Sequence, residues 1–284
     1  MPNSTLTLGD FEVSRVNDSV YWWDGGAIFG VVPKTLWSRK IAGDELNRVP
    51  LAFNSYLIRT GSHNILIETG LGDKRDARAR ERMNVPPITE SLSESLARRG
   101  IDPESIDIVL NSHLHWDHVS GNTTLHQGRV LPAFPAARYF APRGEWEHAH
   151  TRHVRDAVSY LDENYDPLVE SGQMILLEDD FEVAPGVHMR RAPGHTPNMM
   201  AITAESGGQT FCFLSDLVPS ASHLQPSWVA AFDLDPIGAI DSKMRWLGAA
   251  ADGKWWCAFA HETQLAFTQI TRDPKSVFVV AHES

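Results

Sequence analysis

Short runs of apolar and β-branched residues, separated by turn-forming residues, recur along most of the chain and predict β-strands. The second and third of these runs are joined by residues 60–64, Thr-Gly-Ser-His-Asn, a segment typical of a hairpin turn. The predicted strands are Phe11–Val16, Asn54–Arg59, Ile65–Glu68, Ile106–Asn111, Arg138–Ala141, Met174–Leu177, His188–Arg191, Met200–Thr203, Phe211–Ser215 and Trp255–Ala260.

Two other segments carry apolar residues at helical spacing. In the first the apolar residues recur every four positions and Gly100 ends the segment, whereas in the second they recur at three and four positions and Gly253 ends it. The apolar positions are Ile88, Leu92 and Leu96 in the first segment and Ile237, Ile240, Met244 and Leu247 in the second. Strands interleaved with a few amphipathic helices predict an α/β fold, an αββα sandwich of two mixed β-sheets flanked by helices.

Length and composition agree with a single folded unit. The chain has 284 residues, of which 42% are hydrophobic, so it can bury a substantial core. It contains no repeat, low-complexity segment or Gly/Ser linker, and one domain over residues 1–284 is therefore expected.

Charge and cysteine content exclude several classes of partner. The net charge of -11, without a basic run, disfavours nucleic-acid binding. Cys212 and Cys257 lie inside apolar runs, which is how small buried side chains occur, and they form no disulfide framework. The N-terminus lacks a secretory pattern and no run of eighteen apolar residues is present, so we expect a soluble, cytoplasmic protein without a membrane partner.

A dense group of potential metal ligands follows the strand predicted at Ile106–Asn111. The stretch SHLHWDHVSG places His113, His115, Asp117 and His118 within six residues. Neutral imidazole and carboxylate are the nitrogen and oxygen ligands of zinc and similar divalent ions, and loops at strand ends hold such groups in fixed positions. Because no cysteine belongs to the group, a closed structural zinc site is not expected.

Three more residues of these types follow predicted strands, namely His195, Asp216 and His261. Taken alone, each is more often a hydrogen-bonded rim or core residue than a ligand. Together with the first four they make seven candidate ligands, more than one tetrahedral ion needs. The set therefore predicts two ions that share a carboxylate and hold a bridging hydroxide for hydrolysis.

This order of residues resembles the metallo-β-lactamase-fold hydrolases, which carry His-x-His-x-Asp-His, a later Gly-His, an Asp after a strand and a final His. The resemblance spans most of the chain and implies a role for each of the seven residues, with Asp117 and Asp216 as the catalytic carboxylates. It assigns the first ion to His113, His115 and His195, the second ion to Asp117, His118 and His261, and the bridging position between both ions to Asp216.

A further carboxylate is implied by the stretch Ile65–Gly70, which resembles the family's strand ending in Asp-Thr-Gly. Glu68 stands where the family usually has aspartate. A carboxylate here would accept a hydrogen bond from a ligating histidine and fix its tautomer. The alternative, a solvated glutamate at the end of a strand, stays open.

Within the family, the ligand types favour the branch that acts on small molecules. A true β-lactamase usually has a cysteine ligand and lacks the bridging aspartate, which this chain has in Asp216. The acidic charge disfavours the nucleases, and no basic C-terminal segment suits the glutathione of glyoxalase II-like thioesterases. The chain most resembles the N-acyl-homoserine lactonases and the methyl parathion hydrolase-like organophosphate hydrolases.

The aromatic segment Tyr21–Gly30, followed by residues 31–37, resembles an N-terminal loop of those lactonases. In them the loop lines the acyl pocket and contributes to a dimer interface, so the resemblance implies Trp23, Ile28 and Phe29 as substrate contacts and a homodimer as a candidate assembly. Aromatic residues beside paired glycines could make a mobile apolar wall. The alternative is that Trp22, Trp23 and Phe29 are ordinary core residues.

One departure from the lactonase pattern concerns the reaction. Lactonases typically carry a tyrosine three residues after the bridging aspartate, whereas this chain has Pro219, which supplies no hydroxyl. Ser220, Ser222 or His223 could take its place, and His223 is our candidate substrate contact. The absence of the tyrosine makes lactones less favoured, and other esters and phosphotriesters more favoured, as substrates.

The sequence thus predicts a hydrolase of small lactones or esters, with N-acyl-homoserine lactones as candidate substrates and zinc as the favoured metal. Manganese, iron, cobalt and nickel accept the same ligands. Three alternatives stay open: a phosphotriester hydrolase, a persulfide dioxygenase with a single iron, and a metal-binding module without catalysis. The substrate and the oligomeric state do not follow from the sequence.

Overall fold

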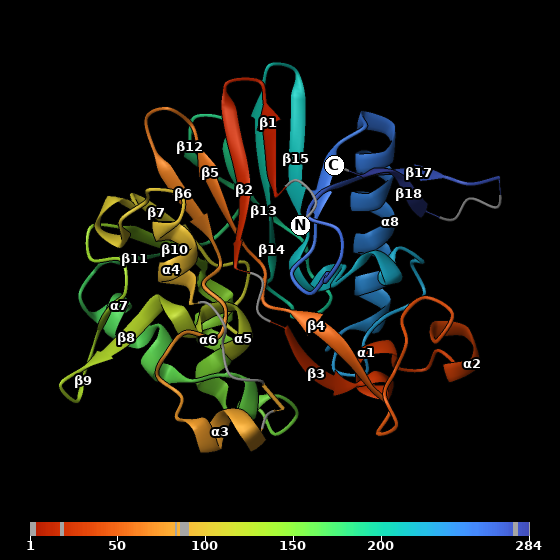
Figure 1. Cartoon of the computed structure of the whole chain (residues 1–284), viewed down its shortest axis with the longest axis horizontal. Helices are drawn as coiled ribbons and strands as arrows, with labels where there is room; N and C mark the ends of the chain where they lie inside the picture. The colour runs from red at the N-terminus through yellow and green to blue at the C-terminus, as the bar shows by residue number, and fades with distance from the viewer. Residues whose placement is uncertain (1–3, 18–19, 83, 86–90, 275–277, 284) are drawn as a thin grey trace.

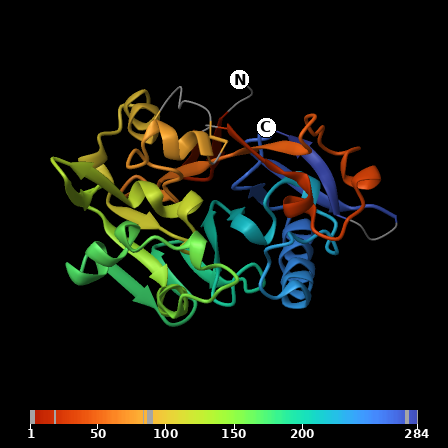
Figure 2. The ribbon, with the colours of Figure 1, turned by 90° about the horizontal axis from the view of Figure 1, so that it is seen from below.

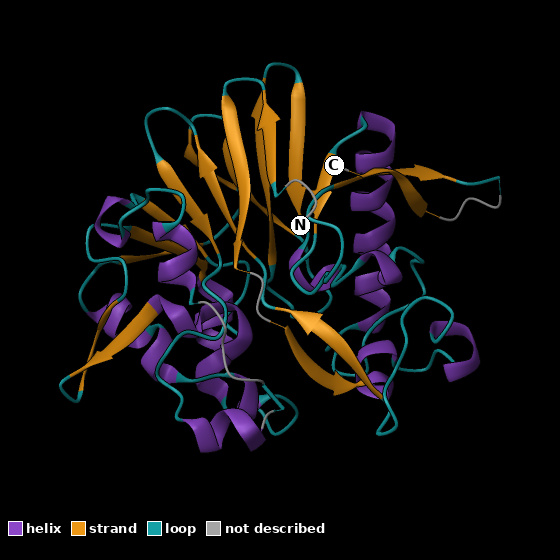
Figure 3. Ribbon diagram, in the orientation of Figure 1, coloured by secondary structure: helices purple, strands orange, loops and turns teal. Residues whose placement is uncertain are grey.

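The computed structural model describes residues 4–17, 20–82, 84–85, 91–274 and 278–283. Two seven-stranded β-sheets form the centre of the molecule and pack face to face (Figure 1). Helices flank the sheets on both sides, and further short elements gather at one end of the strands (Figure 3). The αββα sandwich predicted from the sequence is confirmed.

The first sheet comes from the N-terminal part of the chain and has the order β1-β2-β5-β6-β7-β10-β11. Its strands are β1 (Thr5–Leu8), β2 (Phe11–Asn17), β5 (Ser55–Arg59), β6 (Asn64–Ile67), β7 (Ile108–Leu110), β10 (Arg138–Pro142) and β11 (Met174–Leu177). Strands β5 and β6 form the predicted antiparallel hairpin, whereas β6, β7, β10 and β11 run parallel. The loops that follow these parallel strands therefore leave the same edge of the sheet.

The second sheet has the order β12-β13-β14-β15-β16-β17-β18. Its strands are β12 (Phe181–Ala184), β13 (Val187–Arg191), β14 (Met200–Ser206), β15 (Gln209–Phe213), β16 (Trp256–Ala258), β17 (Thr268–Arg272) and β18 (Phe278–Glu283). Strands β15 and β16 are parallel, and the chain between them forms α8 (Pro236–Gly253). The Asp235 side chain caps the start of α8 by accepting from the Gly238 N–H, and the helix ends at Gly253 as predicted.

The apolar core lies between the sheets. Tyr56 and Ile65 from the first sheet and Phe211 and Phe213 from the second are fully buried there, and the rings of Tyr56 and Phe213 lie 5.5 Å apart. Burying a side chain of this size stabilises the fold by about 1.5–3 kcal/mol. Each sheet also has a smaller apolar cluster on its outer face, which joins that sheet to its helices.

The remaining helices and strands are short. Helix α4 packs against β2 on the first sheet, and α6 and α7 pack against β10 and β11. The short elements are α3 (Ala77–Arg82), α4 (Leu92–Ala97), α5 (Trp116–Val119), α6 (Arg143–Thr151), α7 (Asp166–Glu170), β8 (Thr123–His126) and β9 (Arg129–Pro132). The helix predicted around Leu92 is α4, which begins at a capping box of Ser91 and Glu94, while Ile88 lies outside the described residues.

The segment expected to be a loop is regular structure. Residues Val20–Asp24 form β3, which pairs with β4 (Arg48–Ala52), and α1 (Gly25–Phe29) follows directly, before α2 (Lys34–Trp37). The Asp24 side chain accepts from the first N–H groups of α1, so the chain turns from strand into helix without an intervening loop. The expectation of a loop is wrong. Figure 2 looks onto the end of the sandwich where β3, β4 and α1 lie.

Among the described residues, no helix is both long and apolar enough to cross a membrane.

Candidate metal centre

Four loops, one from the first sheet and three from the second, converge at one end of the sandwich. The loop after β7 carries His113 and His115, and the loop after β13 carries His195. The chain after β15 forms a 3-10 turn, Ser215–Leu217, that holds Asp216, and the chain after β16 holds His261. The structure thus brings together, at the strand ends, residues up to 148 positions apart in the sequence (261 minus 113).

The His-x-His-x-Asp-His motif is partly helical. Helix α5 begins directly after His115, so Asp117 and His118 lie within its single turn. His113 and His118 are fully buried, while Asp117 is partly exposed. The short helix therefore reverses the direction of the chain, and His118 contacts Asp216 of another loop.

The first group of donor atoms consists of His113, His115, His195 and Asp216, whose ligand atoms all lie within 4.8 Å of one another. His195 Nε2 is 3.0 Å from His115 Nδ1 and 3.4 Å from Asp216 Oδ2. These residues match the first site that the family resemblance implied, together with its bridging aspartate.

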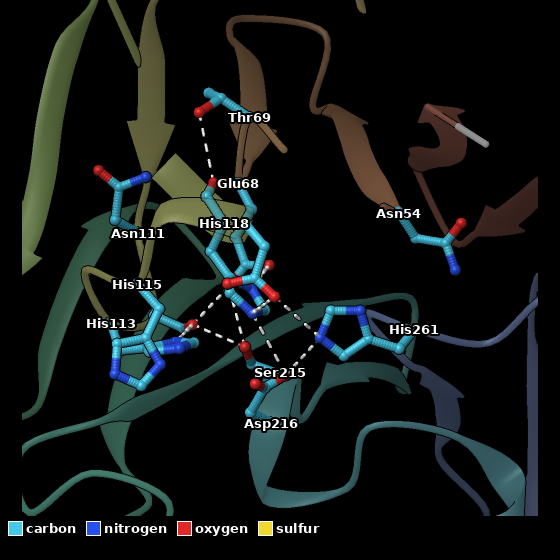
Figure 4. A network of polar contacts seen from close by, with 12 residues as sticks. Asn54, Glu68, Thr69, Asn111, His113, His115, His118, Ser215, Asp216 and His261 are labelled. Atoms are coloured by element: carbon cyan, nitrogen blue, oxygen red, sulfur yellow. Dashed lines mark hydrogen bonds and ion pairs between the residues drawn. The ribbon is translucent and has the colours of Figure 1, made fainter. Parts of the chain in front are cut away.

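The second group consists of Asp117, His118 and His261, whose ligand atoms also lie within 4.8 Å of one another. Asp216 Oδ1 faces this group, at 3.3 Å from His118 Nε2 and 3.0 Å from His261 Nε2. Because its other oxygen, Oδ2, faces His195, Asp216 stands between the two groups. Figure 4 shows Asp216 with His113 and His115 on one side and His261 on the other. A carboxylate in that position is able to bridge two ions.

Hydrogen bonds on the far side of three imidazoles fix their orientation. His118 Nδ1 is 2.7 Å from Glu68 Oε2, and His195 Nδ1 is 2.9 Å from Asp233 Oδ1. His261 Nδ1 is 2.8 Å from the carbonyl oxygen of Ala52, which can only accept. Each Nδ1 therefore carries a hydrogen, and each Nε2 faces the centre, where it provides the lone pair of a metal ligand when the ring is neutral.

The centre contains buried polar atoms that nothing in the described part of the chain satisfies. Nε2 of His113 and of His115 has no hydrogen-bond partner among the described residues, and Nε2 of His118 and Oδ1 of Asp216 face only other groups of the centre, at 3.0 to 3.3 Å. Leaving such an atom without a hydrogen bond costs about 1–3 kcal/mol, so this group of atoms requires a partner. Divalent cations meet that requirement because nitrogen and oxygen lone pairs are their ligands, so the residues present fit a metal centre.

Burial and neighbouring charges set the protonation of these groups. Burial, followed by the nearby histidines, lowers the pKa of His113 and His115 well below its ordinary value, which keeps both rings neutral. Burial alone would raise the pKa of Asp216, but His118, His261 and His195 hold it well below the usual range. Burial also lowers the pKa of His118, His195 and His261, but nearby carboxylates outweigh it and raise the pKa of all three, so a cation that binds these rings displaces protons.

Glu68 is buried and contacts His118 of the second group. Its Oε1 accepts hydrogen bonds from the Ser112 hydroxyl and, at 2.9 Å, from the Ser215 hydroxyl, while Oε2 contacts His118. Glu68 has a positive φ of 56°, so the backbone turns sharply where β6 ends. The alternative of a solvated glutamate is wrong, and we keep the interpretation that Glu68 orients His118.

A cavity of about 230 Å³ opens over the metal centre. Its floor contains His115, Asp117, His195, Asp216 and His261. Apolar side chains form most of its wall, namely Trp23, Ile28, Trp116, Val158, Pro219 and Phe232. The remaining lining residues, Tyr21, Arg155, Asp156 and Ser159, provide polar groups.

The four predicted substrate contacts divide into two pairs. Trp23 and Ile28 line the cavity, whereas Phe29 and His223 do not. Phe29 and His223 are buried behind the wall with their rings stacked 4.7 Å apart. His223 Nε2 lies 3.1 Å from the Ile28 carbonyl and Nδ1 lies 3.0 Å from the Ser220 hydroxyl, so both ring nitrogens are engaged. Burial, and then Lys243, lowers the pKa of His223 to about 3. The prediction that these two residues contact the substrate is therefore wrong. Instead, His223 contacts the end of α1 through the Ile28 carbonyl and the ring of Phe29.

Sequence reasoning missed several residues of the site. Asp233 holds His195, the Ala52 carbonyl holds His261, and Arg155 and Tyr21 reach the cavity from distant segments. Only Tyr21 carried a signal, because it belongs to the aromatic segment already singled out. The contact of Asp233 depends on a tertiary arrangement that no local pattern encodes.

Comparison with known proteins identifies the family. The Metallo-beta-lactamase superfamily model matches residues 48–261, a range that includes all seven predicted ligands. Fold, site and match together define the class as that of metal-dependent hydrolases with a metallo-β-lactamase fold. The chain belongs to the metallo-beta-lactamase superfamily, which confirms the family and the fold predicted from the sequence.

Curated relatives are lactonases of moderate similarity. An N-acyl homoserine lactonase of Bacillus sp is 29% identical over 160 residues, which are 53% of this chain and 57% of the relative. The lactonase AiiB of Agrobacterium fabrum (strain C58 / ATCC 33970) is 27% identical over 194 residues, 63% of this chain and 67% of AiiB. The match thus covers little more than half of the Bacillus enzyme.

Solved structures extend the similarity to nearly the whole chain. A probable metal-dependent hydrolase from Staphylococcus aureus has a TM-score of 0.88 and 30% identity, with 98% of this chain and 100% of that one covered. AidC, a dizinc quorum-quenching lactonase solved with its product, has a TM-score of 0.79 and 20% identity, covering 99% and 97% of the two chains. At that identity AidC shows the shared fold alone.

Proposed function

We propose that this protein is a two-metal hydrolase that opens small lactones or cleaves related esters, with N-acyl homoserine lactones as the first candidate substrates. The observation that carries the proposal is the position of Asp216 between two sets of histidine ligands on the floor of a largely apolar cavity. Seven donors arranged in two groups provide for two ions and leave room for water and substrate.

In this proposal His113, His115 and His195 would hold one ion, Asp117, His118 and His261 would hold the other, and Asp216 faces both groups. Two divalent ions, when bound, would polarise the attacked carbonyl and lower the pKa of a bound water molecule. Zinc is our first choice, because the donors are nitrogen and oxygen and the site is open on the cavity side.

The chain's own residues prepare the reaction. The imidazoles of His118, His195 and His261 are fixed by hydrogen bonds on their far side, so the groups that meet the substrate are preorganised. Asp117 is the carboxylate of the second group that is partly exposed to the cavity, and it can take the proton that the attacking water loses. The same proton can then pass to the leaving oxygen.

The shape and chemistry of the cavity support a small substrate with an apolar tail. Trp23, Ile28 and Val158 offer an apolar wall, and a volume of about 230 Å³ lies below the roughly 300–1,000 Å³ of sites for drug-sized ligands. Arg155 and Asp156 at the same wall offer a donor and an acceptor for an amide group. The lactonase relatives support this reading, because their substrates combine a lactone, an amide and an acyl chain.

A phosphotriester is the second candidate substrate. Pro219 lines the cavity and offers no hydroxyl beside the bridging aspartate, which is where the lactonase pattern places one. A neutral phosphotriester also suits an apolar wall above two cations. Both substrate classes use the same metal centre and differ in the groups that face the cavity wall.

A hydrolysis screen of metal-analysed protein tests the proposal. The substrates are N-hexanoyl homoserine lactone, a simple lactone, an aryl ester and a phosphotriester, and a preference of about 100-fold, roughly 2.7 kcal/mol, decides the class. Two ions per chain with turnover support the proposal. One iron with oxygen consumption on a persulfide supports the dioxygenase, and bound metal without turnover of any substrate supports a binding module.

Three further predictions remain proposals: a single domain over residues 1–284, a cytoplasmic location and a homodimer. A sedimentation measurement of the purified chain tests the homodimer.

A further inference from the structure

The side chain of Tyr21 reaches the metal centre from a distant part of the chain. Tyr21 lies in β3, and its hydroxyl oxygen is 3.5 Å from Asp117 Oδ2. The residue is 4% exposed, and it lines the same cavity as Asp216 and His261. Its hydroxyl therefore stands on the cavity side of the second group of ligands.

The position of this hydroxyl is fixed by the packing of the ring. The ring of Tyr21 stacks on Phe53 at 4.3 Å with an interplanar angle of 17°, and it meets His261 edge-on at 5.9 Å. The backbone of Tyr21 pairs with Leu51 in the β3–β4 hairpin. A side chain held on its face, its edge and its backbone has little rotamer freedom, so the hydroxyl is a preorganised group.

The hydroxyl also has hydrogen-bonding capacity left for a ligand. A separation of 3.5 Å is the outer limit of a hydrogen bond, so Asp117 engages the proton weakly. Tyrosine is a neutral donor at pH 7, and it can donate without carrying charge into the cavity. Among the described residues that line the cavity, only Tyr21 and Ser159 bear a hydroxyl, and Tyr21 is the one that contacts a predicted metal ligand.

We propose that Tyr21 is a catalytic hydrogen-bond donor, whose O–H contacts the substrate oxygen that gains negative charge beside Asp117. This inference rests on the proposed hydrolysis. In that reaction water adds to the acyl carbon and its proton passes to Asp117. The bond from the acyl carbon to the leaving oxygen then breaks, and its electron pair stays on the oxygen. Tyr21 stabilises that charge and keeps its own proton, while Asp117 returns the proton that completes the alcohol.

The substitution Tyr21→Phe in the full, metal-loaded chain tests the proposal because it removes one oxygen and keeps the ring packing. We expect kcat for N-hexanoyl homoserine lactone to fall roughly 10- to 100-fold, with KM changed less than about threefold. The loss is expected to be smaller for a p-nitrophenyl ester, whose leaving oxygen is already stable as an anion. This dependence on the leaving group separates a catalytic role from a structural one.

Two controls accompany this measurement. Tyr56→Phe removes the hydroxyl of another buried tyrosine, which bonds to the Ala266 carbonyl in the core, and it should leave kcat unchanged. Titration with the ring-opened product N-hexanoyl-L-homoserine gives a readout without turnover. Its affinity should fall in Tyr21→Phe and not in Tyr56→Phe, while the metal content of both variants equals that of the wild type.

Two results would overturn the role of Tyr21 and leave the proposed hydrolysis intact. One is a Tyr21→Phe variant with wild-type kcat on the lactone. The other is an equal loss of kcat on the lactone and on the p-nitrophenyl ester, accompanied by loss of metal. A wild-type protein that hydrolyses none of the esters overturns the proposed function instead, and the inference falls with it.

Discussion

At the scale of single residues, the centre depends on groups that contact the ligands from behind. Asp233 is a clear case, since it lies 38 positions from His195 in the sequence and its carboxylate accepts from His195 Nδ1. His195 is 1% exposed and Asp233 is 6% exposed, so water does not replace this contact easily. Such partners orient an imidazole and raise its basicity toward the metal.

We expect Asp233→Asn to weaken metal binding at the first group by roughly 10- to 100-fold, because the histidine loses a charged acceptor. Competition with a chelator measures the affinity, and kcat of the fully loaded variant is measured beside it. Asp241→Asn, at an exposed position of α8, removes the same charge away from the site and is the matched control. Equal metal affinity in both variants would show that Asp233 has no orienting role.

At the scale of elements, loops are held in place by close backbone packing as well as by hydrogen bonds. Gly194 directly precedes His195, has a φ of 147°, and faces the start of α8. A Cβ atom built on it would lie 2.3 Å from the Cα atom of Ala239. Neither backbone can shift without moving His195 or the helix.

Gly194→Ala should therefore destabilise the fold by about 2 kcal/mol or more and reduce metal content. Gly208→Ala is the control, because Gly208 also has a positive φ, of 74°, but a Cβ there meets nothing within 4 Å. The control should lower the free energy of unfolding by only about 1 kcal/mol, because alanine is strained in this backbone conformation. Urea unfolding of both variants gives the difference, and equal midpoints would refute the steric argument.

The elements also show what a sequence can and cannot predict. Continuous apolar runs identified β7, β15 and β16 because most of their residues are buried on both faces, and the ligands follow these strands closely. The hairpin of β3 and β4 escaped notice because it lies outside both main sheets and its strands carry partly exposed residues such as Trp22 and Arg48. Phe29 and His223 were predicted to line the cavity because residue type and position in the chain do not show which side chains face the cavity and which are buried behind its lining.

At the scale of the whole molecule, the metal centre joins the two sheets. His113 and His115 follow a strand of the first sheet, whereas His195, Asp216 and His261 follow strands of the second. Ions bound by both sets would hold the halves of the sandwich together at one end. Binding to the folded state alone stabilises it by about 4 kcal/mol when the free ligand is at a thousand times its Kd.

We therefore expect a strong chelator to lower Tm by about 10 °C, in proportion to the metal removed. His150→Gln provides a control, because His150 lies in a mostly exposed group with Asp162 and Asp166 that could also hold an ion. If the buried centre accounts for the effect, this variant responds to the chelator as the wild type does. A chelator response abolished by His150→Gln would place the stabilising ion on the surface instead.

The central claim is that Asp216 joins two ions in one hydrolytic centre, and the metal content of Asp216→Asn measured beside that of the wild type tests it most directly. Asparagine keeps the shape of the side chain and removes the charge that faces both groups. The account predicts two ions per chain in the wild type, one or none in the variant, and a loss of lactone or ester hydrolysis of roughly 10³-fold in a folded protein. A variant that keeps two ions and wild-type turnover would contradict it.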